Sequence, residues 1–255
     1  MPGTCLILLA GILRSPDNGI MPRTARAAVG GFCYHVINRG NRRAEVFHDP
    51  DDYAAFLRLL RKAHAHAPMR LLAWCLMPNH VHAVLWPKAD GDLAAWMHWL
   101  FGTHARRYNL CHRLTGHVWQ GRFRAFPIQE NEHLVAVNRY VERNPLRANL
   151  VNRAEAWPWS SLVERLAPSL LPLLHPGPVP LPEGWARHVN QPQTEGELER
   201  IGHSVRRGCP FGNHDWVVPT AAQLGLESTL RPHGRPPKSS KPNPNGDQML
   251  LFEKD

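Results

Sequence analysis

Cysteine is scarce in this chain of 255 residues, and its arrangement argues against several classes of protein. The five cysteines are scattered, and none forms a C-x-x-C pair: Cys5, Cys33, Cys75, Cys111 and Cys209. An odd number of scattered cysteines disfavours a disulfide framework, and the lack of paired cysteines disfavours a zinc finger held by thiolates. We therefore expect a protein of the reducing cytoplasm.

Long apolar runs are also missing near the start of the chain. The apolar residues 5–13 are too few to cross a bilayer, and no basic residues precede them as they would in a signal peptide. A second methionine, Met21, opens the basic stretch 21–26. We expect residues 1–21 to be a leader or an over-extended start, with a degenerate targeting peptide as the alternative, and we expect no membrane partner.

Acidic residues are few compared with basic ones. The chain carries 30 Lys and Arg against 21 Asp and Glu, which gives a formal net charge of +9. An excess of this size favours a polyanionic partner, and nucleic acid is the most common one. Charge alone does not identify a ligand, so a basic protein without such a partner stays open at this point.

Apolar periodicity predicts alternating strands and helices over the first 165 residues. In chain order we expect strand 31–37, helix 52–66, strands 69–76 and 80–86, helix 92–108, strand 123–128 and helix 131–143. Asp49 and its neighbours should cap the first helix, and Pro145 should end the third. The β-α-β-β-α-β order is typical of ferredoxin-like α+β domains. It predicts an antiparallel sheet with helices on one face and the other face free for a site.

Proline marks a change of organisation beyond this domain. Of the 24 prolines, 14 lie in residues 168–255. We expect a main domain over 22–165, a proline-rich linker over 166–192, a small helical extension over 193–230, and a basic, disordered tail over 231–255. Short helices are predicted at 194–207 and 220–226.

His80 and His82 are candidate metal ligands. They lie two residues apart in a predicted strand, so both imidazoles project from one face, and two imidazoles make up half of a metal site. A bare pair of this kind is more often structural, because short motifs match by chance. The pair needs a third ligand and a reactive group before it indicates chemistry.

Tyr140 and Asn144 have the chemistry to supply both. The chain has only four tyrosines, and the other three have simple structural positions on a strand or at a helix end: Tyr34, Tyr53 and Tyr108. Tyr140 lies near the end of a predicted helix and Asn144 follows four residues later, so the two side chains can share one face. An amide oxygen suits a hard divalent ion, and a phenol can attack a phosphate bound beside it. A half-buried structural tyrosine fits the same pattern equally well.

Four motifs then occur in one order and spacing. They are residues 34–42 (YHVINRGNR), 77–82 (MPNHVH), 119–123 (WQGRF) and 139–148 (RYVERNPLRA). In this combination the chain resembles the single-tyrosine HUH transposases, and specifically the REP-associated tyrosine transposases of bacteria. The resemblance covers about residues 22–165, which would be the catalytic domain, and continues more weakly into the tail. It also implies that the extension over 193–230 contacts DNA.

The resemblance assigns roles to the candidate residues. His80 and His82 match the paired metal ligands, Tyr140 the nucleophile, and Asn144 the third ligand, where related transposases often have glutamine. The family is known for metal-dependent cleavage and rejoining of single-stranded DNA, which implies Mg²⁺ or Mn²⁺ here. We favour these ions over zinc, because two histidines and one amide leave room on a harder ion for a substrate oxygen and water. Attack by Tyr140 would release a 3′-hydroxyl and form a 5′-phosphotyrosine intermediate, which keeps the energy needed for rejoining.

Arginines are the candidate DNA contacts, because basic side chains bind phosphates. The set is Arg39, Arg42, Arg43, Arg106, Arg107, Arg122, Arg124 and Arg235. Each alone fits a solvated surface charge, but together they predict a groove. The expected partner is single-stranded DNA in REP or other palindromic hairpins, bound by a monomer or homodimer at the nucleoid. The alternatives are a non-catalytic, sequence-specific DNA-binding regulator derived from a transposase, and a metallohydrolase that needs no covalent intermediate.

Overall fold

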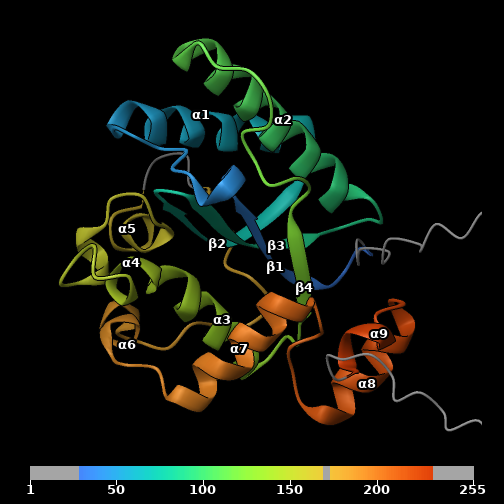
Figure 1. Ribbon diagram of the computed structural model, residues 1–255. Helices are drawn as coiled ribbons and strands as arrows, with labels where there is room; N and C mark the ends of the chain where they lie inside the picture. Colours follow the sequence, from blue (N-terminus) through green and yellow to red (C-terminus); the bar gives the residue numbers. More distant parts are fainter. Residues whose placement is uncertain (1–28, 169–172, 232–255) are drawn as a thin grey trace, which may run out of the picture.

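A four-stranded antiparallel sheet forms the centre of the computed structural model, which describes residues 29–168 and 173–231 (Figure 1). The elements in chain order are β1 (Cys33–Arg39), η1 (Asn41–Arg43), α1 (Pro50–His66), β2 (Met69–Met77), β3 (His80–Pro87), α2 (Asp92–His112), β4 (Arg124–Ile128), α3 (Glu132–Glu142), α4 (Asn144–Arg147), η2 (Ala154–Ala156), α5 (Ser161–Leu166), α6 (Trp185–Asn190), α7 (Glu195–Arg207), α8 (His214–Gln223) and α9 (Glu227–Leu230).

The strand order is β2-β3-β1-β4, and each neighbouring pair is antiparallel. With α1 and α2 as the two crossovers, this is the ferredoxin-like arrangement. The predicted α+β fold class is therefore confirmed. Most of the predicted strand and helix bounds are close to those observed, although α2 continues to His112 instead of ending at residue 108.

The first face of the sheet carries the main core. Val36, Leu76 and Ala83 project from this face and pack in one cluster with Phe56 of α1 and Trp96 of α2. All five side chains are buried, and such burial of large apolar groups is the main stabilising contribution to a fold of this size. The two crossover helices therefore lie on one face, as the β-α-β-β-α-β order predicts.

The second face is only partly open, because helices from beyond the ferredoxin-like unit pack on it. Val137 of α3 and Ile201 of α7 join Cys75 and Val84 of the sheet in a second buried cluster. In Figure 1, α3 and α7 lie below the sheet and α1 and α2 above it. The sheet face that was expected to be free for a site is thus partly covered by α3 and α7.

Local signals explain where the helices begin and end. The carboxylate of Asp49 accepts a hydrogen bond from the backbone N–H of Asp52 at 3.0 Å, which caps α1 as predicted. Pro145 ends the preceding helix near Glu142, but it also starts the short helix α4, in which it occupies the first turn. Proline is favoured there because its missing N–H has no partner to lose.

The C-terminal part packs on the domain through several short helices. Within the segment predicted as a linker, α6 carries Trp185, which is buried in a third cluster with Leu162 and Val189. The helix expected at 220–226 is wrong in its bounds: residues 220–223 are the last turn of α8, which begins at His214 and contains Pro219, and a turn then leads to α9. The predicted leader over 1–21 and all but the first residue of the tail lie outside the described residues. In the described part of the chain, no helix is both long enough and apolar enough to cross a membrane.

Candidate functional site

His80 and His82 lie on the second face of the sheet, on the β3 strand. In the antiparallel register His82 is opposite Ile37 of β1 and Cys75 of β2, and His80 is opposite Arg39. Directly opposite residues share a face, so both imidazoles point toward α3. Their ring centroids are 4.9 Å apart, and His82 is buried while His80 is half-buried. The two predicted ligands thus lie side by side, and His80 is the one that solvent can reach.

A two-residue hairpin positions this pair. Pro78 and Asn79 connect β2 to β3, and the Asn79 amide donates to the carbonyl of Arg43 at 3.1 Å. The Asn79 carbonyl also accepts from the N–H of Gly40 at 2.8 Å. A Cβ at Gly40 would lie 2.2 Å from the Ala44 carbonyl oxygen, so only glycine allows this close approach. The turn after β1 is therefore fixed against the start of β3.

Each imidazole is held by a hydrogen bond at Nδ1. His82 Nδ1 is 2.8 Å from His35 Nε2 of β1, and His80 Nδ1 is 2.6 Å from Asn79 Oδ1. Partners of this kind orient metal-binding histidines and fix their tautomer. Nε2 is therefore the remaining ligand nitrogen of each ring. His35 was not a sequence candidate, although it lies inside the first of the four motifs.

Burial and nearby cations keep these imidazoles neutral. Burial is the largest cause in each case, and it lowers the pKa of His80 to about 4 and that of His35 to about 3. The pKa of His82 is also lowered well below its usual value, chiefly by burial, with Arg147 and Arg39 adding to the effect. Arg39 and Arg147 add to the effect on His80. Neutral imidazole is the form that binds a metal ion.

Tyr140 of α3 lies directly against the histidines. Its ring centroid is 5.9 Å from that of His82 and 6.1 Å from that of His35, both in edge-on geometry. Only 7% of Tyr140 is exposed, so it projects into the space between α3 and the sheet. The structure therefore brings the predicted nucleophile and the predicted ligand pair together, which helical and strand spacing alone did not establish.

Asn144 and Arg147 of α4 lie beside Tyr140. Asn144 is buried, and its Oδ1 accepts a hydrogen bond from the Arg147 guanidinium at 2.7 Å. An amide oxygen has two lone pairs, so Oδ1 can still take a second partner. The guanidinium carbon of Arg147 lies 4.3 Å from the centroid of the Tyr140 ring. Arg147 was not a sequence candidate, but its place three residues after Asn144 in the RYVERNPLRA motif could have indicated it.

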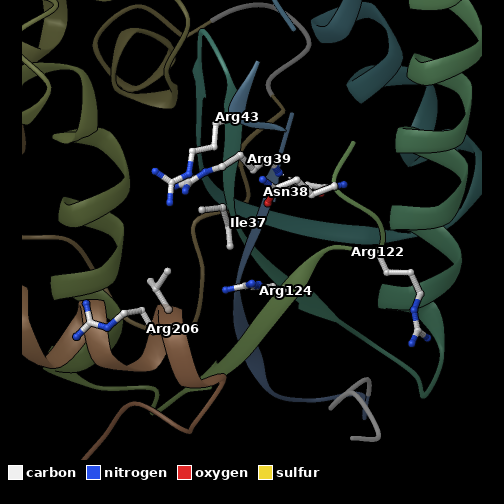
Figure 2. A pocket seen from close by; sticks show the side chains of 9 residues that line it. Ile37, Asn38, Arg39, Arg43, Arg122, Arg124 and Arg206 are labelled. Atoms are coloured by element: carbon white, nitrogen blue, oxygen red, sulfur yellow. Dashed lines mark hydrogen bonds between the residues drawn. The ribbon is translucent and has the colours of Figure 1, made fainter. Parts of the chain in front are cut away.

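A basic cleft of about 590 Å³ opens beside the histidines (Figure 2). Five arginines and four other residues line it: Arg39, Arg43, Arg122, Arg124, Arg206, Ile37, Asn38, Gln120 and Val205. Arg124 is opposite Ile37 in the sheet, and Ile37 is opposite His82, so one row of side chains leads from the cleft to the histidines. Among the residues that the structure describes, no carboxylate lines the cleft, so its charge is suited to phosphate groups.

Four of the predicted DNA contacts meet in this cleft. The segment before β4 pairs with the end of β1, since Gln120 N donates to the Arg39 carbonyl at 2.9 Å and Asn41 N to the Val118 carbonyl at 2.8 Å. This pairing brings Arg122 and Arg124 beside Arg39 and Arg43. In Figure 2 the guanidinium of Arg122 points away from those of the other labelled arginines.

The other predicted contacts lie elsewhere. Arg42 is exposed in η1, and Arg106 and Arg107 are exposed on α2, outside the lining of the cleft. Arg235 lies outside the described residues. Arg206 of α7, which no spacing pattern indicated, takes a place in the lining instead. The extension after residue 192 thus contributes a cation to the cleft.

Comparison with known proteins finds matches among transposases. Residues 28–144 match the family model described as "Transposase IS200 like". A REP-associated tyrosine transposase of Escherichia coli (strain K12) is 24% identical over 148 residues, which are 56% of this chain and 84% of that protein. A solved structure of a REP-associated tyrosine transposase bound to a REP hairpin aligns with a TM-score of 0.50 and 21% identity, over 64% of this chain and 96% of that one. The resemblance drawn from the four motifs is confirmed.

Proposed function

We propose that this chain, whose residues 28–144 match the family model described as "Transposase IS200 like", cleaves and rejoins single-stranded DNA at hairpins of the REP type. One observation carries the proposal. Tyr140 lies against the His80–His82 pair, on the sheet face where a cleft lined by five arginines opens. The proposed nucleophile, the proposed metal ligands and the basic cleft are thus neighbours.

Tyr140 is proposed as the nucleophile. Its hydroxyl oxygen attacks the phosphorus of a scissile phosphodiester, the bond from phosphorus to the 3′-oxygen breaks, and that oxygen leaves as a 3′-hydroxyl. The DNA is then joined to Tyr140 through its 5′-phosphate, and attack by another 3′-hydroxyl reverses the step. Arg147, which lies over the Tyr140 ring, is suited to hold a phosphate oxygen beside the phenol.

The residues present fit a divalent metal ion. The Nδ1 atoms of His80 and His82 are engaged, which leaves both Nε2 atoms as ligands, and the Asn144 oxygen retains a lone pair. We propose these three residues as the ligand set, with Mg²⁺ or Mn²⁺ as the ion. When bound, such an ion stabilises the negative charge that develops on the attacked phosphate.

The function is tested by incubating the full chain with single-stranded DNA that carries the hairpin next to its own gene, with Mn²⁺ or with EDTA. We expect a covalent protein–DNA adduct on a denaturing gel, a free 3′-hydroxyl on the other fragment, and neither product with EDTA. A free 5′-phosphate without an adduct would favour the metallohydrolase instead. Tight binding of DNA that stays intact would favour a non-catalytic DNA-binding regulator.

His35 provides a test of the metal site that does not depend on catalysis. His35→Ala removes the hydrogen bond to His82 Nδ1, so we expect Mn²⁺ affinity to fall by about 10- to 100-fold, as for other supporting partners of histidine ligands. His35→Gln keeps an amide that can reach His82 and should recover part of the loss. Isothermal titration with Mn²⁺ measures both, with exposed His98→Ala as the control. Equal affinities in all three variants would contradict the proposed ligand set.

Arg124 provides a test of the cleft. One phosphate contact fewer should lower the slope of log affinity against log salt by about 0.7 for a single strand, and should weaken binding at every sequence tested. Fluorescence anisotropy of labelled DNA between low and moderate salt measures the slope for Arg124→Ala. Arg106→Ala is the matched control, since Arg106 lies on α2 and donates to the Thr103 hydroxyl instead of lining the cleft. The cleft is the wrong surface if both variants lower the slope equally.

A further inference from the structure

A second group of metal-binding side chains lies away from the proposed catalytic face. His48 precedes α1, Asp52 is in the first turn of α1, and His112 is the last residue of α2. One ligand atom from each lies within 4.8 Å of the other two. Within residues 29–168 and 173–231, this is the one group of three His, Cys, Asp or Glu side chains that converges in this way. Both helices pack on the first face of the sheet, opposite His80 and His82.

The three side chains are held in place by further contacts. Asp52 Oδ2 accepts from the backbone N–H of His48 at 3.0 Å, and Asp52 Oδ1 lies 3.2 Å from His112 Nε2. One carboxylate thus joins the start of α1 to the end of α2. The rings of His48 and His112 are 5.2 Å apart at their centroids. The three ligand atoms thus lie close together in the observed conformation of the backbone.

Tyr108 supports the group from α2, one turn before His112. Its hydroxyl is 2.7 Å from His48 Nε2, and its ring centroid is 4.4 Å from that of His112. A polar partner on one nitrogen of a histidine ligand fixes the ring and is a common feature of metal centres. Asp49 orients Asp52 in turn, by capping the N–H of Asp52.

We infer that His48, Asp52 and His112 form a second metal site, which binds a transition-metal ion of the Zn²⁺ class. Two imidazoles and one carboxylate are a frequent zinc ligand set, which leaves a fourth position for water. The ion ties the two helices of the first face together at their ends. It also fixes His48, which ends the loop that carries Arg43 to the basic cleft.

The test uses the full chain without a histidine tag, in a His80→Ala, His82→Ala background that removes the proposed catalytic ligands. We expect one Zn²⁺ per chain by elemental analysis after dialysis, and a higher Tm with Zn²⁺ than with EDTA, because a ligand that binds only the folded state stabilises it. With Co²⁺ in place of Zn²⁺, visible absorption bands report the imidazole-containing coordination sphere directly.

Two variants and one control locate the ion. His112→Ala and Asp52→Asn should each weaken Zn²⁺ binding by about 100-fold or more, since loss of a group that merely supports a ligand already costs about 10- to 100-fold. Asp52→Asn retains an oxygen that can accept from His48 N–H, so it should fold even if His112→Ala does not. His98→Ala, on the exposed side of α2, should bind Zn²⁺ as tightly as the background does.

Comparing each variant with and without Zn²⁺ separates metal binding from its effect on the fold. The inference is overturned if Zn²⁺ leaves the Tm of the background unchanged, because Asp52 and His112 are then only an ion pair. It is equally overturned if the Zn²⁺-dependent rise in Tm survives in both Asp52→Asn and His112→Ala.

Discussion

Replacing Tyr140 by phenylalanine should abolish the covalent protein–DNA adduct and lower the rate of strand cleavage by at least about 1,000-fold, since no other group takes over a missing nucleophile efficiently. The ring stays between His82 and Arg147, so the substitution removes one oxygen atom from a site that is otherwise unchanged. DNA binding should be retained, because the cleft contains no part of Tyr140. Denaturing gels with end-labelled DNA measure the adduct, and anisotropy measures the binding.

The control for this prediction is Tyr53→Phe. It makes the same chemical change in the core on the first face of the sheet, where Tyr53 stacks on Trp159. That variant should form the adduct at the rate of the unaltered chain. If Tyr140→Phe still forms an adduct, another residue is the nucleophile. If it still cleaves and leaves a free 5′-phosphate, the chemistry is hydrolysis.

Loss of Glu142 should have the largest effect on stability. Glu142 is fully buried in α3, and its carboxylate accepts hydrogen bonds from the Trp185 indole at 2.5 Å, from the Arg165 guanidinium at 2.7 Å, and from the Ser161 hydroxyl. These partners come from α5 and α6, so one carboxylate holds two helices to the helix that carries Tyr140. Glu142→Ala leaves three donors without an acceptor.

We expect Glu142→Ala to lower the free energy of unfolding by about 3 kcal/mol, a value at the lower end for a broken buried pair because Arg165 is partly exposed. At roughly 2–4 °C per kcal/mol for a chain of this size, Tm should fall by about 6–12 °C in a thermal melt. Glu199→Ala, an exposed glutamate on α7, should change Tm by no more than about 2 °C. Similar shifts in both variants would contradict the role of Glu142 as a buried anchor.

Helices and strands were largely predictable because their signals are local. Alternating apolar residues placed β1 closely, runs of β-forming residues placed β2 and β3, and the Asp49 cap placed the start of α1. Proline effects were less predictable. Pro145 was expected to end a helix, yet it also starts α4, and Pro219 lies inside α8. Whether proline ends or begins a helix depends on which backbone carbonyls have other partners, and the sequence does not give those partners.

The candidate site divides in the same way. Strand spacing was enough to put His80 and His82 on one face of the sheet. A spacing of four residues predicted that Tyr140 and Asn144 share one side of a helix, but the structure places Asn144 in α4 and Tyr140 in α3. Spacing could not show that α3 crosses over the histidines, since that depends on how apolar residues such as Val137 and Ile201 pack on the sheet. The same packing decides that His35 supports His82, which no pattern of adjacent residues indicates.

The sequence by itself determined the α+β class, the order of the elements, the resemblance carried by four motifs, and the residue types available for chemistry. Only the tertiary structure decided which of the arginines share a cleft, that Arg206 joins them while Arg106 does not, and that His48, Asp52 and His112 meet. The physical reason is the range of the interactions. Periodicity and capping act between near neighbours in the chain, whereas a site is assembled by strand register and helix packing between segments that are far apart in it.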